Sequence, residues 1–269
     1  MRKIILYLLP FLFCLSCVDK KESVQPISLS IKNIYMDSVG IRVIHYMDGK
    51  ELFDTIIASK DTFMMGNLKE DMYLLAIYWP RTFVPHQIYK DRSFNKEVGE
   101  YYNLTKAFYV EPKSSLVYEF YTDSLYTGEE IELNNITKVN VNVSQCQTCA
   151  VADEFWDNYT KFFDRKEVLV DELNLSFYRS IENKNKELSR TNFIKADSVK
   201  KSLLTDSLYK IDFDNLVQLH PESKASTFFV FYQLYLERDF EKYRNSFDIL
   251  KGQALESKYY QMIKKQYDN

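Results

Sequence analysis

The first half of the chain alternates apolar and polar residues in short runs, which is the pattern of β-strands. Residues 27–34 carry apolar side chains at 27, 29 and 31, and residues 40–47 lead into Asp48 and Gly49, a strong hairpin-turn signal. The same pattern predicts further strands at 52–57, 62–65, 72–79, 116–121, 130–133 and 136–143. Residues 81–102 lack this alternation and are predicted to form a long, irregular loop. This half is therefore predicted to hold about seven or eight short strands.

The second half has the pattern of helices. No glycine occurs between Gly128 and Gly252, and Pro221 is the only proline there, which favours long helices. From Ala150 onward apolar side chains recur every three or four residues, beginning with Val151 and Phe155. Similar spacing predicts helices at 173–188, at 199–219, from Lys224 onward, at 240–250 and at 255–263.

The two patterns together predict an α+β fold. An antiparallel β domain is expected at 27–143, and an all-helical domain at 144–269. The 21 tyrosines and 19 phenylalanines supply enough apolar area for a sizeable core. The polar segment 18–26 is predicted to be a short flexible tether ahead of the fold.

Residues 1–17 are predicted to be a signal peptide outside the fold. Arg2 and Lys3 precede an apolar run at 4–15, which is shorter than the roughly 20 residues of a membrane span. The run ends in Ser16 and Cys17, and this resembles the signal of bacterial lipoproteins, although Cys14 stands where that signal usually has leucine. The resemblance implies that Cys17 is lipidated and becomes the first mature residue. An ordinary cleaved signal or a short anchor is the alternative.

Composition and charge exclude several classes of function. The formal net charge is −3 and the chain has no basic patch of the kind that binds nucleic acid. With six glycines and no Gly-rich phosphate loop, a nucleotide site is not expected. His45, His86 and His220 are isolated and form no metal-ligand spacing, so we expect neither metal nor cofactor. Adjacent carboxylates such as Asp153 and Glu154 are predicted to lie on a solvated surface.

The candidate chemistry lies at Cys146 and Cys149, between the last predicted strand and the first predicted helix. A helix N-terminus favours the thiolate of the first cysteine, and the second can resolve a mixed disulfide, so the pair has the spacing of a redox site. The context differs from a thioredoxin module, because helices follow instead of strands and no proline is placed to face the disulfide. A structural or adventitious disulfide that caps the helix is the favoured interpretation.

The chain as a whole resembles lipoproteins that carry a domain of unknown function ahead of a thioredoxin-like module. The features that match are the signal with Cys17, the hairpins, the strand with Tyr73, the His220–Ser226 segment HPESKAS and the later segment SKYYQMIKK. The resemblance spans most of the chain by pattern and not by an exact motif. It implies that the thioredoxin module would follow where this chain ends, so no catalytic residue is carried over, and the Cys146–Cys149 pair does not match that family's active site.

These observations predict a non-catalytic lipoprotein of the bacterial cell envelope. We expect it to be secreted across the inner membrane and held by lipid at Cys17, in the outer membrane, with an envelope protein or a glycan as its partner. The alternative is a thiol–disulfide redox protein that uses Cys146 and Cys149. A structural envelope protein without a specific small ligand is the third possibility.

Overall fold

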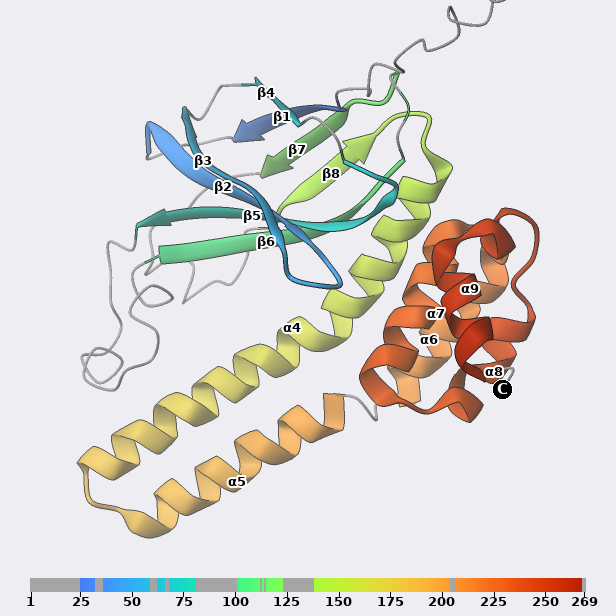
Figure 1. The fold of residues 1–269 in the computed structure, drawn as a ribbon. Helices are drawn as coiled ribbons and strands as arrows, with labels where there is room; N and C mark the ends of the chain where they lie inside the picture. Colours follow the sequence, from blue (N-terminus) through green and yellow to red (C-terminus); the bar gives the residue numbers. More distant parts are fainter. Residues whose placement is uncertain are drawn as a thin grey trace, which may run out of the picture.

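The computed structural model describes residues 25–267, except for gaps at 32–35, 59–61, 66–67, 81–100, 112, 114, 123–137 and 204–206. Eight strands come first in the described chain and the helices follow them (Figure 1). The α+β class predicted from the sequence is therefore confirmed. The predicted strand at 130–133, Cys17 and residues 18–24 of the predicted tether lie outside the described residues, whereas Gln25 and Pro26, the last two residues of that predicted tether, begin strand β1.

The strands form two four-stranded sheets, with the orders β4-β1-β7-β8 and β3-β2-β5-β6. Their bounds are β1 Gln25–Ile31, β2 Ser38–His45, β3 Glu51–Ala58, β4 Thr62–Met65, β5 Asp71–Pro80, β6 Tyr101–Val110, β7 Tyr118–Thr122 and β8 Asn140–Val143. The described strand pairs are antiparallel except for β1 and β7, which run parallel with Leu29 opposite Phe120. The first sheet is therefore mixed, whereas the alternation in the sequence predicts antiparallel pairing throughout.

The predicted hairpin at Asp48 and Gly49 joins β2 to β3. Gly49 has a φ of 66°, a left-handed conformation that glycine adopts without steric cost. The backbone N–H of Gly49 donates to the carbonyl of His45 over 3.0 Å, which closes the turn. This turn places His45 at the end of β2, next to the start of β5.

The first hydrophobic core lies between the two sheets. It takes Val39, Ile41 and Val43 from β2 and Phe120 from β7, and all four are buried. Phe108 on β6 packs edge-on against Phe120, with ring centroids 4.9 Å apart. Burying such aromatic side chains contributes on the order of 2–3 kcal/mol each, so this layer is the main reason that the sheets stay together.

The helices follow β8. Their bounds are α4 Gln147–Glu182, α5 Lys186–Leu203, α6 Ser207–Leu219, α7 Lys224–Glu237, α8 Phe240–Asp248, the 3-10 helix η3 Gly252–Glu256 and α9 Lys258–Tyr267. Helix α4 begins beside the sheets and runs away from them, α5 returns along it, and α6 to α9 form a bundle beside the first half of α4 (Figure 1). At about 1.5 Å per residue, the 36 residues of α4 span about 54 Å.

A second core joins the bundle to the outer face of the second sheet. Met72, Ala107 and Tyr109 from β5 and β6 belong to the same buried cluster as the apolar residues of α4, α6 and α7. Phe155 of α4 stacks on Phe229 of α7, with ring centroids 4.7 Å apart. Strands β5 and β6 are therefore covered on both faces, by the first sheet on one side and by helices on the other.

The structure differs from the predicted elements at strand β6 and at two of the predicted helices. Strand β6 lies at Tyr101–Val110, where its beginning overlaps the predicted loop. The predicted helix at 173–188 is instead the end of α4 and the start of α5, separated by a turn at residues 183–185 in which Lys184 has a φ of 55°. The predicted helix at 199–219 likewise covers the end of α5 and the whole of α6.

Candidate functional site: the Cys146–Cys149 pair at the start of α4

The chain turns sharply between β8 and α4. Gln145 adopts a φ of 62°, and Cys146 follows in an extended conformation as the N-cap of α4. The backbone N–H of Cys149 donates to the Sγ atom of Cys146 over 3.2 Å. Cys146 thus takes the place that serine or aspartate usually occupies, because its sulfur accepts from a backbone donor that the helix itself leaves unsatisfied.

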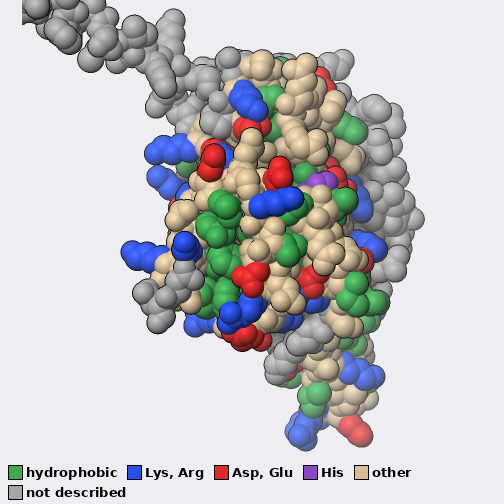
Figure 2. Space-filling view, turned by 90° about the vertical axis from the view of Figure 1, so that its right-hand side faces the viewer, with side chains coloured by type: hydrophobic (Ala, Val, Ile, Leu, Met, Phe, Trp, Pro, Cys, Tyr) green, Lys and Arg blue, Asp and Glu red, His purple; other side chains and the backbone are tan. Residues whose placement is uncertain are grey.

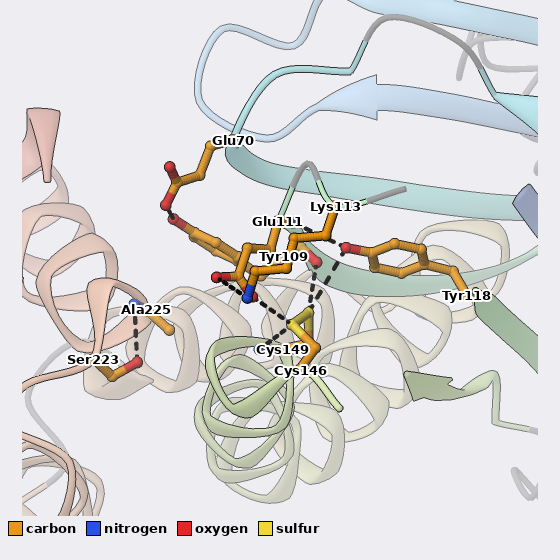
Figure 3. The surroundings of a disulfide bond; sticks show 9 residues. All are labelled: Glu70, Tyr109, Glu111, Lys113, Tyr118, Cys146, Cys149, Ser223 and Ala225. Carbon is orange, nitrogen blue, oxygen red and sulfur yellow. Dashed lines mark hydrogen bonds and ion pairs between the residues drawn. A yellow bond between two sulfur atoms is a disulfide. The ribbon is translucent and has the colours of Figure 1, made fainter. Parts of the chain in front are cut away.

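The structure brings the two candidate cysteines together as a disulfide. The two sulfur atoms are 1.96 Å apart and the two Cα atoms 5.2 Å apart, so the bridge closes within the first turn of α4 (Figure 3). Only 3% of Cys146 and 6% of Cys149 is exposed. Both cysteines belong to the core between the sheets, so the bridge is a buried part of the junction between β-strands and helix.

Residues of β6, of β7 and of the segment between these strands surround the two sulfur atoms (Figure 3). The Sγ atom of Cys149 lies 3.7 Å from the hydroxyl of Tyr118 and 3.4 Å from the carbonyl oxygen of Tyr109. The Tyr118 hydroxyl also accepts from the backbone N–H of Glu111 over 2.9 Å. Burial raises the pKa of Tyr118 to about 12, so this hydroxyl stays protonated at neutral pH and acts as a neutral donor.

The charges beside the pair do not favour an attacking thiolate. One carboxylate oxygen of Glu111 lies 3.3 Å from the Sγ atom of Cys146, and the other forms an ion pair with Lys113 over 2.9 Å. A carboxylate this close opposes a second negative charge on Cys146, against the effect of the helix N-terminus. Because the sulfurs are also buried, a partner disulfide cannot approach them in this conformation.

Two surface hollows of the described chain lie away from the cysteine pair. A hollow of about 600 Å³ on α7 and α9 is lined by Phe231, Tyr235, Met262, Lys265 and Gln266. A second hollow of about 380 Å³ lies on α4 and α6 and is lined by Glu154, Asp157, Asn158, Lys161, Asp212, Asn215, Leu216 and Leu219. Neither of these two hollows includes Cys146 or Cys149 in its lining.

A polar cluster that the sequence patterns do not reveal centres on Asp71, at the start of β5. The side chain is buried, and one oxygen accepts from the Nζ of Lys258 and lies 2.8 Å from the Nε2 of His45. The other oxygen accepts from the hydroxyl of Tyr259 and from the backbone N–H of Met72. Asp71 therefore connects the second sheet directly to α9.

Opposing effects set the charges in this cluster. Burial acts to raise the pKa of Asp71, but the hydrogen bonds from Lys258, Tyr259 and His45 outweigh it and hold the pKa below its ordinary value. Burial likewise acts to lower the pKa of His45, and hydrogen bonds with Asp71 and Asp48 raise it above its ordinary value. Both ring nitrogens of His45 face carboxylate oxygens, so its doubly protonated, charged form satisfies both hydrogen bonds.

The neighbouring Glu70 extends the connection between sheet and bundle. Its carboxylate accepts from the hydroxyl of Tyr109 over 2.9 Å and forms an ion pair with Lys224, at the start of α7, over 2.8 Å. Of the pair predicted to lie on a solvated surface, Glu154 is exposed as expected, whereas Asp153 is partly buried. Asp153 forms an ion pair with Lys106, whose side chain is buried beneath α4.

The two described histidines, which the sequence predicts to be isolated, form no common centre. His45 lies in the Asp71 cluster, His220 lies 2.8 Å from Glu154 on α4, and His86 is outside the described residues. Within the described chain, no three histidine, cysteine, aspartate or glutamate side chains are placed to hold a metal ion. A search of the described helices also finds none long and apolar enough to span a membrane.

Comparison with known proteins adds no relative. No protein-family model, no curated protein and no solved structure matches this chain.

Proposed function

We propose that the protein is a non-catalytic lipoprotein of the bacterial cell envelope that acts as a binding or accessory module. Its anchor is lipid on Cys17, after secretion across the inner membrane, and its place is the outer membrane. Its relatives are lipoproteins that carry a similar N-terminal domain of unknown function ahead of a thioredoxin-like module. An envelope protein or a glycan is the partner.

The observation that carries the non-catalytic part of this proposal is the position of the disulfide. Cys146 and Cys149 are the candidate reactive pair, and both are buried between β-strands and α4 with Glu111 against one sulfur. A working thiol–disulfide exchange site needs an accessible sulfur with a stabilised thiolate. The bridge instead supports a structural role, in which it fixes the conformation of the first turn of α4 where that turn packs into the core between the sheets.

A thiol–disulfide oxidoreductase is the second candidate. The observation that favours it is the placement of Cys146 at the N-cap of α4, where the unpaired backbone N–H groups of the helix favour a thiolate. In that mechanism the Cys146 thiolate attacks a substrate disulfide and expels one substrate thiol. Cys149 then attacks the mixed disulfide and releases the second, leaving the cysteine pair oxidised and the substrate reduced by two electrons.

Peptide mass spectrometry of the protein purified from its native membrane tests the anchor. The proposal predicts that the N-terminal peptide begins at Cys17 and carries acyl chains. An N-terminal peptide that begins elsewhere, or an unmodified Cys17, would contradict the lipid anchor.

A reductase assay separates the two candidates. The reduced chain and its Cys146→Ser variant are mixed with insulin as a disulfide substrate, in the presence of a chemical reductant. The non-catalytic proposal predicts equal rates for the two chains, both equal to the rate with reductant alone. A faster rate for the parent chain that is lost in Cys146→Ser would establish the oxidoreductase instead.

A further inference from the structure

The second half of α4 and the whole of α5 form a helical arm that extends away from the sheets and from the bundle (Figure 1). The two helices contact each other through polar residues: the buried Asn192 of α5 donates to the hydroxyl of Ser176 of α4 over 2.8 Å. Phe177 and Phe193 add one aromatic contact, with ring centroids 5.8 Å apart. The turn at residues 183–185 forms the far end of the arm.

The far end of the arm is basic. Residues 179–195 include five basic and two acidic residues, so their net charge is 5 − 2 = +3, whereas the whole chain has −3 and the rest therefore −6. All five basic side chains are exposed, namely Arg179, Lys184, Lys186, Arg190 and Lys195. Within the part of the chain that the structure describes, none of them forms an ion pair. Figure 2 shows basic side chains at the lower end of the molecule, where the arm lies.

Large apolar side chains are exposed among these charges. Phe193 is 60% exposed, Ile194 54% and Leu188 46%. Arg190 precedes Phe193 by three residues and Ile194 by four, and Lys186 precedes Arg190 by four, so these four side chains share one side of α5. Asn192 and Ala196 face α4 and are buried, and Phe193 lies at the edge of that contact, with one part of its ring against Phe177 and the rest exposed. Cations beside exposed phenylalanine and isoleucine are typical of helices that lie in the interface of an anionic membrane.

We propose that this arm docks on an anionic phospholipid surface through Lys186, Arg190, Phe193 and Ile194. Charge complementarity selects this occupant. A second copy of the arm would bring two surfaces of +3 together, and repulsion opposes that contact. The separation of charge between the arm and the rest of the chain also turns the arm toward an anionic surface. The apolar side chains then enter the boundary between the headgroups and the acyl chains. A hydrated anionic polymer has no such apolar boundary, so the exposed apolar side chains favour a membrane as the partner.

This inference does not depend on lipid at Cys17, because the contact lies at the other end of the molecule from β1 (Figure 1). A reporter at residue 194 therefore separates docking of the arm from anchoring of the N-terminus. The test uses the full chain with Ile194→Trp, added to vesicles of phosphatidylglycerol and phosphatidylcholine in equal parts. Leu219→Trp is the matched control, because Leu219 is also exposed, at 68% against 54% for Ile194, but lies at the end of α6, away from the arm.

The proposal predicts that the tryptophan emission of Ile194→Trp shifts to shorter wavelength and is quenched when the lipids carry brominated chains. Leu219→Trp is expected to show neither change. Adding Lys186→Glu and Arg190→Glu to Ile194→Trp is expected to weaken vesicle binding by at least about tenfold, because each basic residue contributes to attraction by anionic lipid. Raising the salt concentration is expected to weaken it as well.

Three outcomes would overturn the proposal. The first is an Ile194→Trp emission that anionic vesicles leave unchanged. The second is an equal shift with vesicles of phosphatidylcholine alone, because that excludes recognition of charge. The third is an equal shift in Leu219→Trp, because that places the contact outside the arm. The mass of the N-terminal peptide is independent of all three, so failure here and failure of the anchor at Cys17 are distinguishable.

Discussion

Asp71 on β5 and Lys258 on α9 form an ion pair across 187 positions of sequence. Asp71 is buried, whereas half of the Lys258 side chain remains exposed, so the aspartate is the member whose charge depends on its partners. The hydrogen bonds from Tyr259, His45 and Met72 complete its coordination. This relationship fixes the end of the described chain to the sheet and is the basis of the first two predictions.

Replacing Asp71 with asparagine is expected to lower the free energy of unfolding by about 3 kcal/mol, because several donors aimed at the carboxylate lose a charged acceptor. Urea unfolding followed by circular dichroism measures the change. Asp48→Asn is the control, because Asp48 also contacts His45 but is solvent-exposed, and it is expected to lower the free energy of unfolding much less. Equal losses in the two variants would contradict a special role for Asp71.

The stability of the fold is expected to depend on pH through His45 and Asp71. The folded pKa of His45 is raised, so its contribution is fully present below about pH 6.5 and is lost as the pH rises through the folded pKa. The folded pKa of Asp71 is lowered, so its contribution is present above about pH 4 and is lost as the pH falls through that folded value. Urea midpoints measured below, between and above these two limits report both effects.

The matched variant for the upper limit is His45→Gln, which keeps a polar side chain but does not titrate. The parent chain is expected to lose stability as the pH rises above about 6.5, and His45→Gln is expected to lose less over the same interval. Parallel pH profiles for the two chains would exclude His45 as the source of this dependence.

The two roles of Cys146, as half of the disulfide and as N-cap of α4, are separable by substitution. Cys146→Ser keeps a capping oxygen and removes the bridge, which is expected to cost about 2 kcal/mol for so short a loop. Cys146→Ala removes the cap as well, and is expected to cost about 1 kcal/mol more. Urea unfolding of both variants in the Cys149→Ala background tests this. Identical stabilities for serine and alanine would contradict the capping role.

Gly40 on β2 leaves room for the ring of Tyr78 on β5. A Cβ atom at Gly40 would lie 2.1 Å from that ring, so a side chain there forces the tyrosine away. The Tyr78 hydroxyl donates to Asp54 over 2.6 Å, and Arg42 lies over the ring. Gly40→Ala is therefore expected to destabilise the fold by about 2 kcal/mol.

The partner variant for Gly40 is Tyr78→Ala. If the clash with the ring is the cause, Gly40→Ala is expected to cost much less when Tyr78 is already alanine. Additive losses in the double variant, measured by urea unfolding, would place the cost of Gly40→Ala in the backbone and not in the ring.

The fold class followed from the sequence because the two halves differ in the period of their apolar residues. The alternation of apolar and polar residues did not predict strand β6, because its residues from Lys106 to Val110 are all buried. They lie between the first sheet on one side and helices on the other. A strand covered on both faces has no alternation to detect. The parallel pairing of β1 with β7 also leaves no local signal, because it joins segments about 90 residues apart.

The break between α4 and α5 was misplaced because it contains neither glycine nor proline. Lys184 adopts the left-handed conformation there, with Asn183 and Asn185 on either side. Asparagine is tolerated in such turns, but it is a weaker signal than glycine. The apolar residues at 173–188 therefore suggested one continuous helix where the chain in fact reverses.

The cysteine pair was found from its spacing alone, whereas the Asp71 cluster was not. Cys146 and Cys149 are neighbours in sequence, so a local motif identifies them. The partners of Asp71 come from β2 and from α9, which only the folded chain brings together. The ion pairs of the buried Lys106 were not predicted for the same reason, because its acidic partners Asp153 and Asp157 lie on α4.

The central claim is that the Cys146–Cys149 disulfide is a structural bridge, and a glutathione redox titration of the purified chain tests it most directly. Alkylation of the free thiols followed by mass spectrometry gives the oxidised fraction at each glutathione ratio. A structural bridge is expected to have a reduction potential below about −300 mV and to stay oxidised across the titration. A potential near about −200 mV would contradict it, because the pair would then exchange readily and the oxidoreductase would become the better account.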